Sequence, residues 1–211
     1  ENKTGASGNI GTGVAARAAP DGNTLLMTAK VYVVNPSLFK SVPYDPKAMT
    51  PIGIAAISNL VLVVHPSVPA RSMAELVALV RSQPGKFNYA SPGSATPHHL
   101  AMELLVDSTR ANLLHVPYKG AAPAITAVMG GEVAGFFGDI PGLIGHIKGG
   151  RLKPVGIAAA RRHALLPDVR TLAEQGIRGV ESSNWYALFA PAKSPTSRIE
   201  ALNGAVRRAL A

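Results

Sequence analysis

Apolar residues recur along this chain in two alternating patterns, which are short β-branched runs and longer stretches with apolar side chains three or four positions apart. The short runs predict buried strands at residues 24–28, 51–57, 60–65, 87–90, 113–116, 133–137, 152–159 and 185–189. The longer stretches predict helices at residues 8–17, 73–83, 97–107, 121–129, 141–148 and from Pro195 onward. Strands that alternate with helices at this spacing predict an α/β fold, with parallel sheets covered by helices on both faces.

Local stop and start signals set the expected boundaries of these elements. Ser72 and Glu75 form a capping box, and Thr171 and Glu174 form a second one. The Asn35-Pro36 pair is expected to break the chain, because proline lacks the N–H that a continuing helix or strand needs. Residues 58 and 59 are expected to separate two buried strands.

The most informative segment is the small-residue turn SPGSATPHHL at residues 91–100, which leads into a predicted helix. Thr96 is a good N-cap, and Pro97 suits the first helical position. The unpaired N–H groups of such a helix start lie at the positive end of its dipole and favour a carboxylate or another small oxyanion. The strand before the turn places it at a strand's carboxyl end, where open α/β folds hold ligands. An ordinary strand–helix connection with a well-made cap accounts for the same residues.

Composition and charge narrow the function classes. The chain has 211 residues, 47% of them hydrophobic and 16% charged, which is typical of a folded α/β protein. It contains no cysteine, so disulfides, thiolate metal sites and cysteine nucleophiles are excluded. A formal net charge of +9 favours anionic partners. We expect no nucleic-acid binding, because the adjacent basic pairs at 161–162 and 207–208 have no interleaved aromatic residues for base stacking.

Three catalytic or cofactor patterns are incomplete in this sequence. His99 and Glu103 are four apart on one helical face, but a third ligand at useful spacing is missing, so we expect no metal. A buried His99 that fixes the turn by hydrogen bonding is the favoured interpretation. Ser94 lacks the G-x-S-x-G elbow of serine hydrolases, and the glycines of residues 8–13 are in the wrong order for a dinucleotide fingerprint.

Eight short motifs, in consistent order along essentially the whole chain, resemble a known family. They are GASGNIG (5–11), APDG (19–22), NPSLF (35–39), PYDP (43–46), SPGSATPHHL (91–100), HVPYKG (115–120), LPDV (166–169) and TLAE (171–174). The family is the substrate-binding proteins of tripartite tricarboxylate transporters, the Bug family of periplasmic receptors. No single motif is decisive, but the ordered set is specific.

The resemblance implies a type II periplasmic-binding-protein fold, in which two lobes are joined by two crossing segments and close on a ligand. One lobe would comprise residues 1–58 plus 178–211, and the other residues 59–177. The implied function is capture of a small carboxylate (a di- or tricarboxylate, an amino acid or an aromatic acid) for integral membrane transporter subunits. The resemblance further implies a periplasmic monomer without cofactor or catalysis. An α/β enzyme that holds an anionic substrate at the same helix start is the alternative.

The sequence departs from the family pattern in two places. The chain opens at Glu1 without an initiator methionine, and it looks either processed or shortened. The strand, glycine-rich loop and helix with which the family begins, and which supply half of its carboxylate grip, are absent. Ala95 stands where the family usually has glycine, and its methyl group is expected to narrow the approach to the ligand or to change which N–H groups point inward.

The candidate ligand-binding residues follow from the turn and from the resemblance together. The turn residues expected to bind one carboxylate, through backbone N–H groups and the hydroxyls of the first and last, are Ser91, Gly93, Ser94, Ala95 and Thr96. Asn35 would donate an amide hydrogen bond from the first lobe, or be a turn residue placed by Pro36. Asp139 would accept from an ammonium or hydroxyl group, which favours amino or hydroxy acids, or would serve as N-cap of the following helix. Lys119 is expected to be solvated.

Overall fold

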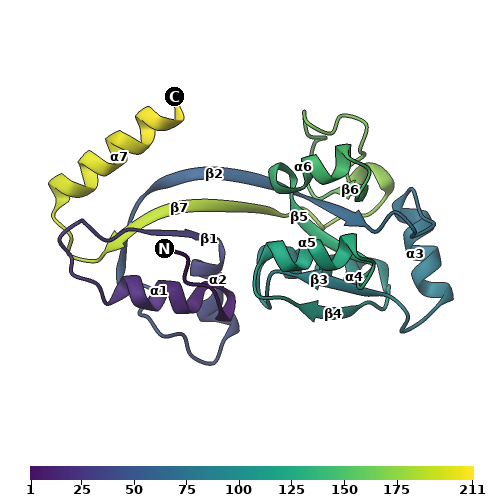
Figure 1. Cartoon of the computed structure of the whole chain (residues 1–211), viewed down its shortest axis with the longest axis horizontal. Helices are drawn as coiled ribbons and strands as arrows, with labels where there is room; N and C mark the ends of the chain where they lie inside the picture. Colours follow the sequence, from purple (N-terminus) through teal and green to yellow (C-terminus); the bar gives the residue numbers. More distant parts are fainter. The chain divides into compact units, whose positions relative to one another are not determined.

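The computed structural model describes all 211 residues, which form two compact units. Unit 1 comprises Glu1–Ile57 and Trp185–Ala211, and unit 2 comprises Ser58–Asn184. The elements, in chain order (Figure 1), are η1 (Ala6–Gly8), α1 (Asn9–Ala16), β1 (Leu26–Ala29), α2 (Val31–Leu38), β2 (Met49–Val64), α3 (Met73–Ser82), β3 (Asn88–Ser91), α4 (Pro97–Thr109), β4 (Leu114–Pro117), α5 (Ala121–Met129), β5 (Gly135–Asp139), α6 (Ile140–Lys148), β6 (Lys153–Ile157), η2 (Ala173–Gln175), β7 (Ser183–Pro191) and α7 (Thr196–Leu210).

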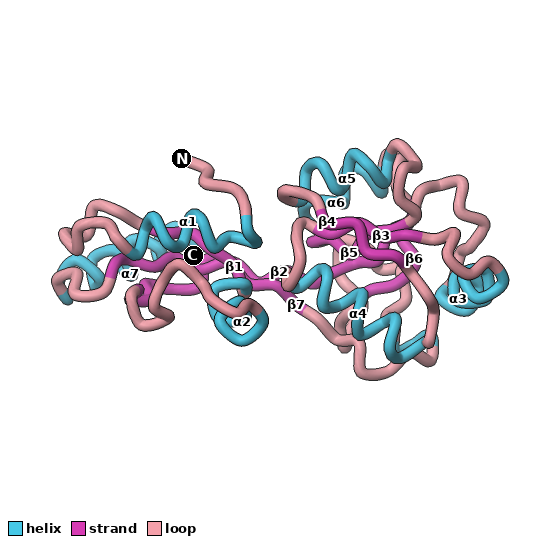
Figure 2. The backbone as a smooth tube through the Cα atoms, turned by 90° about the horizontal axis from the view of Figure 1, so that it is seen from below, coloured by secondary structure: helices cyan, strands magenta, loops and turns pink.

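The sheet of unit 2 is covered by helices on both faces, as the sequence pattern predicts. Side chains of β2 alternate between the faces, because successive residues of a strand point in opposite directions. Leu60 and Leu62 pack in one core with residues of α3 and α4, whereas Val61 and Val63 pack in a second core with residues of α5 and α6. Figure 2 shows α4 and α5 on opposite sides of β3, β4 and β5.

The sheet is mixed, which corrects the expectation of purely parallel strands. β3 pairs in parallel with β4 and with β5, while β2 pairs antiparallel with β5 and with β6. β2 is also one continuous strand of 16 residues rather than two. Ser58, which was expected to interrupt it, is buried within it. The strand therefore continues through the polar pair at residues 58 and 59.

Unit 1 is built on β1, β7 and β2, which are neighbours in that order, with β1 antiparallel to β7. Its small core is aromatic. The Tyr32 ring stacks on Tyr44 with centroids 5.6 Å apart, and it lies 4.8 Å from the Phe189 ring. Burial of three rings supplies much of the apolar contact that a small unit needs.

Helix α2 runs through the Asn35-Pro36 pair, so the expected chain break there is wrong. Proline removes the N–H that would bond to the carbonyl four residues earlier, which here is that of Tyr32. The Tyr44 hydroxyl donates to this carbonyl instead, at 3.3 Å. A side chain from outside the helix thus satisfies the acceptor that the proline leaves open.

The two units divide between residues 57 and 58 and again between residues 184 and 185. The lobe bounds that the family resemblance implies, at 58/59 and 177/178, stay predictions. Residues 178–184 contact unit 2; the Ser182 N–H, for example, donates to the Ala158 carbonyl at 2.9 Å.

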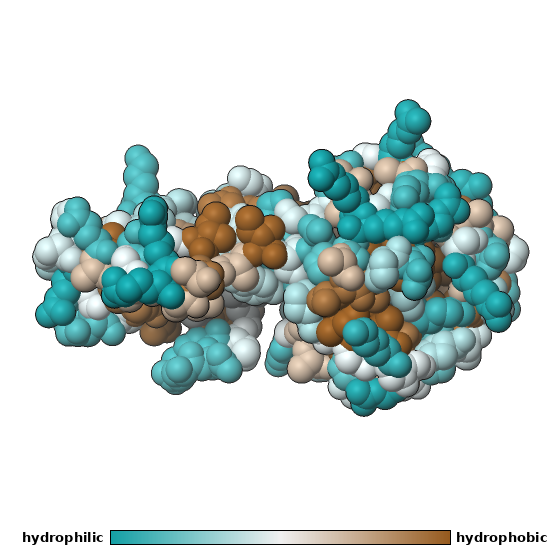
Figure 3. Space-filling view, turned by 90° about the horizontal axis from the view of Figure 1, so that it is seen from above, coloured by the Kyte–Doolittle hydropathy of each residue, from teal (hydrophilic) through white to brown (hydrophobic).

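Apolar side chains reach the surface of both units (Figure 3). In unit 1 the exposed ones include Val14, Met27, Val33 and Ile57. The expected amphipathic helix at the C-terminal end is present as α7, but none of its residues is fully buried. No helix of this chain combines the length and the apolar character that crossing a bilayer requires.

The Gly138→Ala variant is predicted to destabilise unit 2. A methyl group at residue 138 of β5 would lie 2.4 Å from the Phe136 ring and 2.6 Å from the Leu143 side chain. Such overpacking costs about 1–3 kcal/mol of unfolding free energy. Chemical denaturation measures the change. Gly142→Ala, in α6 with no atom within 4 Å of the added carbon, is the matched control. It should be neutral or stabilising by up to about 1 kcal/mol, because alanine is the better helix former. Equal stabilities of the two variants would contradict the prediction.

Candidate functional site

Three parallel strands of unit 2 end at one edge of the sheet. β3 ends at Ser91, β4 at Pro117 and β5 at Asp139. Each is followed by a helix, so that α4, α5 and α6 all begin at this edge (Figure 1). Backbone hydrogen bonds join two of the connections, because the Tyr118 N–H donates to the Ser91 carbonyl at 2.9 Å and the Gly120 N–H to the Pro92 carbonyl at 3.0 Å.

The three helix starts give this edge a positive electrostatic character. Each helix dipole places a partial positive charge at its N-terminus, where the first N–H groups have no acceptor within the helix. α4 is capped as predicted, with Thr96 Oγ1 accepting from the His99 N–H at 3.4 Å. The residues at the N-caps of α5 and α6, Gly120 and Asp139, make no side-chain capping bond.

The turn at residues 91–96 is held by its own side chains. Ser91 is fully buried, and its hydroxyl donates to the Gly93 carbonyl at 3.0 Å and accepts from the Gly93 N–H at 3.2 Å. Thr96 Oγ1 also donates to the Gly93 carbonyl, at 2.8 Å. The Ala95 N–H donates to His99 Nδ1 at 3.2 Å, which confirms that His99 fixes the turn. The Thr96 N–H donates to the Gly93 carbonyl at 3.4 Å. Three of the expected amide donors, those of Gly93, Ala95 and Thr96, therefore have acceptors inside the fold, while Ser94 is exposed.

Ala95 adopts a left-handed backbone conformation, with φ at 64°. An L-residue with a Cβ is strained there, because the side chain approaches the neighbouring carbonyl. Ala95 is thus kept in this conformation by the contacts around it, and its side chain is buried.

Asp139 at the end of β5 pairs with a buried histidine of α4. Its Oδ2 lies 2.9 Å from His98 Nε2, and the His98 ring stacks on Phe136 with centroids 5.9 Å apart. Asp139 does occupy the N-cap position of α6, but its side chain turns to His98 rather than to the helix N–H groups. The pair links the starts of α4 and α6. His98 was not among the expected site residues, since 41 residues of sequence separate it from its partner.

Two further histidines stack directly behind the turn. The rings of His99 and His115 lie 4.0 Å apart, and Tyr89 stacks on His115 at 4.9 Å. His115 Nε2 is 2.7 Å from the Ser91 hydroxyl oxygen. Burial lowers the pKa of His99, against the opposing effect of Glu103, and burial with the neighbouring His99 lowers the pKa of His115 to about 4. Both imidazoles are therefore neutral at pH 7. Sequence reasoning missed His115, which no local signal connects to the turn.

Asn35 belongs to unit 1, whereas the other expected site residues belong to unit 2. It is buried in α2, and its amide nitrogen donates to the Ser7 carbonyl at 2.9 Å and to Asn9 Oδ1 at 2.7 Å. Both amide hydrogens are thus engaged within unit 1. Lys119 is exposed, as expected.

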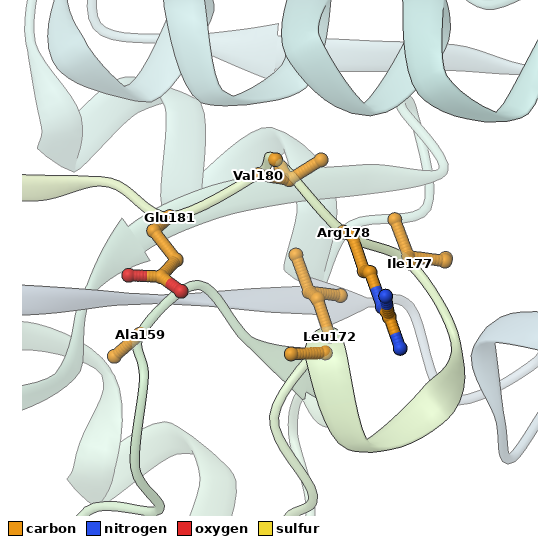
Figure 4. Close-up of a pocket in the computed structure, with 8 residues that line it drawn as sticks. Ala159, Leu172, Ile177, Arg178, Val180 and Glu181 are labelled. Carbon is orange, nitrogen blue, oxygen red and sulfur yellow. The ribbon is translucent and has the colours of Figure 1, made fainter.

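Two hollows are lined by residues outside the carboxyl edge of β3, β4 and β5, and none of the expected site residues lines either of them. One, of about 250 Å³, lies in unit 2 and is lined by residues that include Leu172, Arg178 and Glu181 (Figure 4). The other, of about 540 Å³, is an open groove of unit 1 beside β1. No group of three or more metal-ligating side chains is assembled anywhere in the chain.

Comparison with known proteins gives one family model that matches the whole chain, residues 1–211, with the description "Tripartite tricarboxylate transporter family receptor". The chain is 35% identical over 213 residues to the UPF0065 protein in the tcbD-tcbE intergenic region of Pseudomonas sp. (strain P51). It is 33% identical over 213 residues to the protein BugT of Bordetella pertussis. Both alignments cover 100% of this chain but only 63% and 65% of those proteins, so the chain spans about two thirds of their length.

Solved structures with the same fold include two proteins of Rhodopseudomonas palustris with bound dicarboxylates. Rpa4515 with adipate has a TM-score of 0.95 at 29% identity, and the match covers 98% of this chain and 70% of that protein. MatC (Rpa3494) with bound malate has a TM-score of 0.91 at 29% identity, and the match covers 97% of this chain and 70% of that protein.

Proposed function

Because this chain belongs to the tripartite tricarboxylate transporter receptor family, we propose that it is a non-catalytic solute-binding protein of the periplasm. It takes up a small carboxylate and delivers it to integral membrane transporter subunits. The observation that carries the binding role is the meeting of three helix N-termini, those of α4, α5 and α6, at the carboxyl edge of β3, β4 and β5.

The helix starts at this edge suit a carboxylate. Helix N-termini stabilise an anion by their dipoles and by N–H groups that have no acceptor in the helix. The formal net charge of +9 adds a general attraction for anions. In this proposal residues 93–96 form the wall against which the carboxylate lies, and the hydroxyls of Ser91 and Thr96 keep that wall in shape through Gly93.

A dicarboxylate is the favoured ligand class. The two relatives of known structure described above hold adipate and malate, which share two carboxylates on a short chain. Asp139 adds a hydrogen-bond acceptor at the same edge, and an acceptor there favours a ligand that also carries a hydroxyl or ammonium group.

Isothermal titration calorimetry against malate, adipate, citrate, aspartate and benzoate tests the proposal. We expect stoichiometric binding of at least one dicarboxylate, and ¹H NMR of the mixture should show the acid unchanged after hours. Conversion of the bound acid would favour the enzyme alternative. Failure of every acid to bind would contradict the carboxylate role for this chain.

The Ala95→Gly variant is predicted to bind a dicarboxylate at least as tightly as the native chain and to be more stable. Glycine relieves a left-handed conformation that costs an L-residue roughly 1–2 kcal/mol. It also removes a methyl group from the wall of the proposed site. Calorimetry and thermal unfolding measure the two effects.

Arg110→Gly is the matched control for this change. Arg110 is another residue of unit 2 with a left-handed backbone, φ 53°, and it lies at the far end of α4. Its replacement should raise stability without changing affinity. A large loss of affinity in Ala95→Gly alone would mean that the methyl group contributes to binding.

A further inference from the structure

We propose that His99 and His115 form a neutral imidazole clamp that holds the turn at residues 91–96 in its binding shape and releases it on acidification, so that carboxylate binding at this edge is gated by pH. The gating of binding rests on the proposed function. The clamp itself is a statement about the fold that can be tested without any ligand.

The two histidines of the clamp contact the turn at two points. His99 Nδ1 accepts the Ala95 N–H at 3.2 Å, near the end of the turn. His115 Nε2 lies 2.7 Å from Ser91 Oγ, at its beginning, and the same oxygen bonds to both the N–H and the carbonyl of Gly93. The hydrogen of the Ser91 hydroxyl goes to the Gly93 carbonyl, so His115 Nε2 carries a ring hydrogen and donates it to Ser91 Oγ. His99 is therefore the member whose protonation is passed directly to the backbone of the turn.

The two imidazoles are held as one stack. Their rings lie 4.0 Å apart and 26° from parallel, and Tyr89 of β3 stacks against both, at 4.9 Å from His115 and 6.3 Å from His99. The Tyr89 hydroxyl donates to Glu103, which fixes the outer end of the stack on α4. His99 comes from α4 and His115 from β4, so the stack joins three elements that surround the turn.

The bond from Ala95 requires a neutral His99. A ring nitrogen that accepts a hydrogen bond cannot carry a proton, so the ring hydrogen is on Nε2, which lies 3.7 Å from Glu103 Oε1. Protonation of Nδ1 would turn the acceptor into a donor facing the Ala95 N–H. Ala95, strained at φ 64°, would then lose the contact that holds it.

The charged groups around the stack set the direction of the pH effect. The titratable neighbours are Glu103 of α4, Tyr89 of β3 and the two histidines themselves. Burial lowers the pKa of His99 although Glu103 opposes it, and it lowers the pKa of His115 to about 4. Both values lie below the ordinary 6.5, so a released or unfolded turn takes up protons more readily than the clamped one. The clamp is complete above pH 6.5 and weakens as the pH falls from there toward 4.

Amide hydrogen exchange, read by NMR on the whole chain, tests the clamp without ligand. We expect the protection factor of the Ala95 N–H to fall about tenfold or more between pH 7 and pH 5, the equivalent of one lost hydrogen bond. His99→Asn keeps an acceptor near the Nδ1 position but does not titrate, so it should retain the protection and lose the pH dependence. His99→Leu should lose the protection at both pH values.

His163→Leu is the matched control. His163 Nδ1 also accepts a backbone N–H of unit 2 at 3.2 Å, that of Leu165, but it lies in a loop outside the stack. Its replacement should leave the protection factor of the Ala95 N–H, and its pH dependence, unchanged. The clamp is refuted if protection of Ala95 in the native chain does not change with pH, or if it falls equally in His99→Asn.

Malate calorimetry at pH 7 and pH 5 tests the gating. The native chain should lose about tenfold more affinity than His99→Asn over this range. The comparison cancels proton uptake by malate itself, which is the same for both proteins. Equal losses would overturn the gating. Absence of malate binding at pH 7 in both proteins would count against the proposed ligand class. The hydrogen exchange of the Ala95 N–H would still show whether the clamp exists.

Discussion

Replacement of Asp139 by asparagine should weaken malate binding about 10- to 100-fold, the loss expected when a hydrogen bond to a charged group is removed. Adipate binding should change by less than about threefold, because adipate has no hydroxyl group to donate to residue 139. Asparagine keeps an oxygen that can accept from His98 Nε2, now 2.9 Å from the carboxylate, so the link between α4 and α6 is preserved. Calorimetry with the two acids side by side measures the difference.

A long-range charge effect must be separated from this contact. Asp168→Asn removes the same charge from an exposed position of unit 2 and is the matched control. It should leave both affinities within about twofold, since exposed charges are largely screened by salt. Equal losses for malate and adipate in Asp139→Asn would show that Asp139 supports the site through His98 and does not contact the hydroxyl.

The Asn35→Leu variant should lower the unfolding free energy of unit 1 by roughly 2–4 kcal/mol, because a buried and a partly buried acceptor each lose their donor, at about 1–3 kcal/mol each. These are the Ser7 carbonyl and Asn9 Oδ1, and the Asn9 side chain is itself buried. The decrease in unfolding free energy stays below the sum of the two penalties. Asn35 Oδ1 is buried without a hydrogen-bond partner, and leucine removes this unfavourable group.

The single tryptophan makes this measurement specific to unit 1. Trp185 lies in that unit and packs at the edge of its aromatic core, so urea unfolding followed by tryptophan fluorescence reports on it. Asn112→Leu, at an exposed position of unit 2, should shift the free energy by less than about 0.5 kcal/mol. A change below 1 kcal/mol in Asn35→Leu would mean that the two amide bonds do not stabilise the unit.

The helix starts were predictable from the sequence because their signals are local. Ser72 accepts from the Glu75 N–H, and Thr96 caps α4 with Pro97 at its first position, as their spacing indicates. The family resemblance was likewise confirmed over the whole chain. α2 was missed because the group that allows Pro36 inside it, the Tyr44 hydroxyl, lies 12 residues from the carbonyl that it satisfies.

The candidate site also has a part that follows from local sequence and a part that depends on the tertiary structure. The small residues, the cap and the proline of residues 91–97 determine a helix start that can attract an anion, because hydrogen bonds over three or four positions depend on neighbouring residues alone. The partners of that turn, in contrast, come from distant parts of the chain. His115 meets Ser91 across 24 residues and Asp139 meets His98 across 41, and both meetings require β3, β4 and β5 to lie side by side. Strand order and the antiparallel place of β2 follow from which apolar faces bury one another, and no local pattern in the chain encodes that choice.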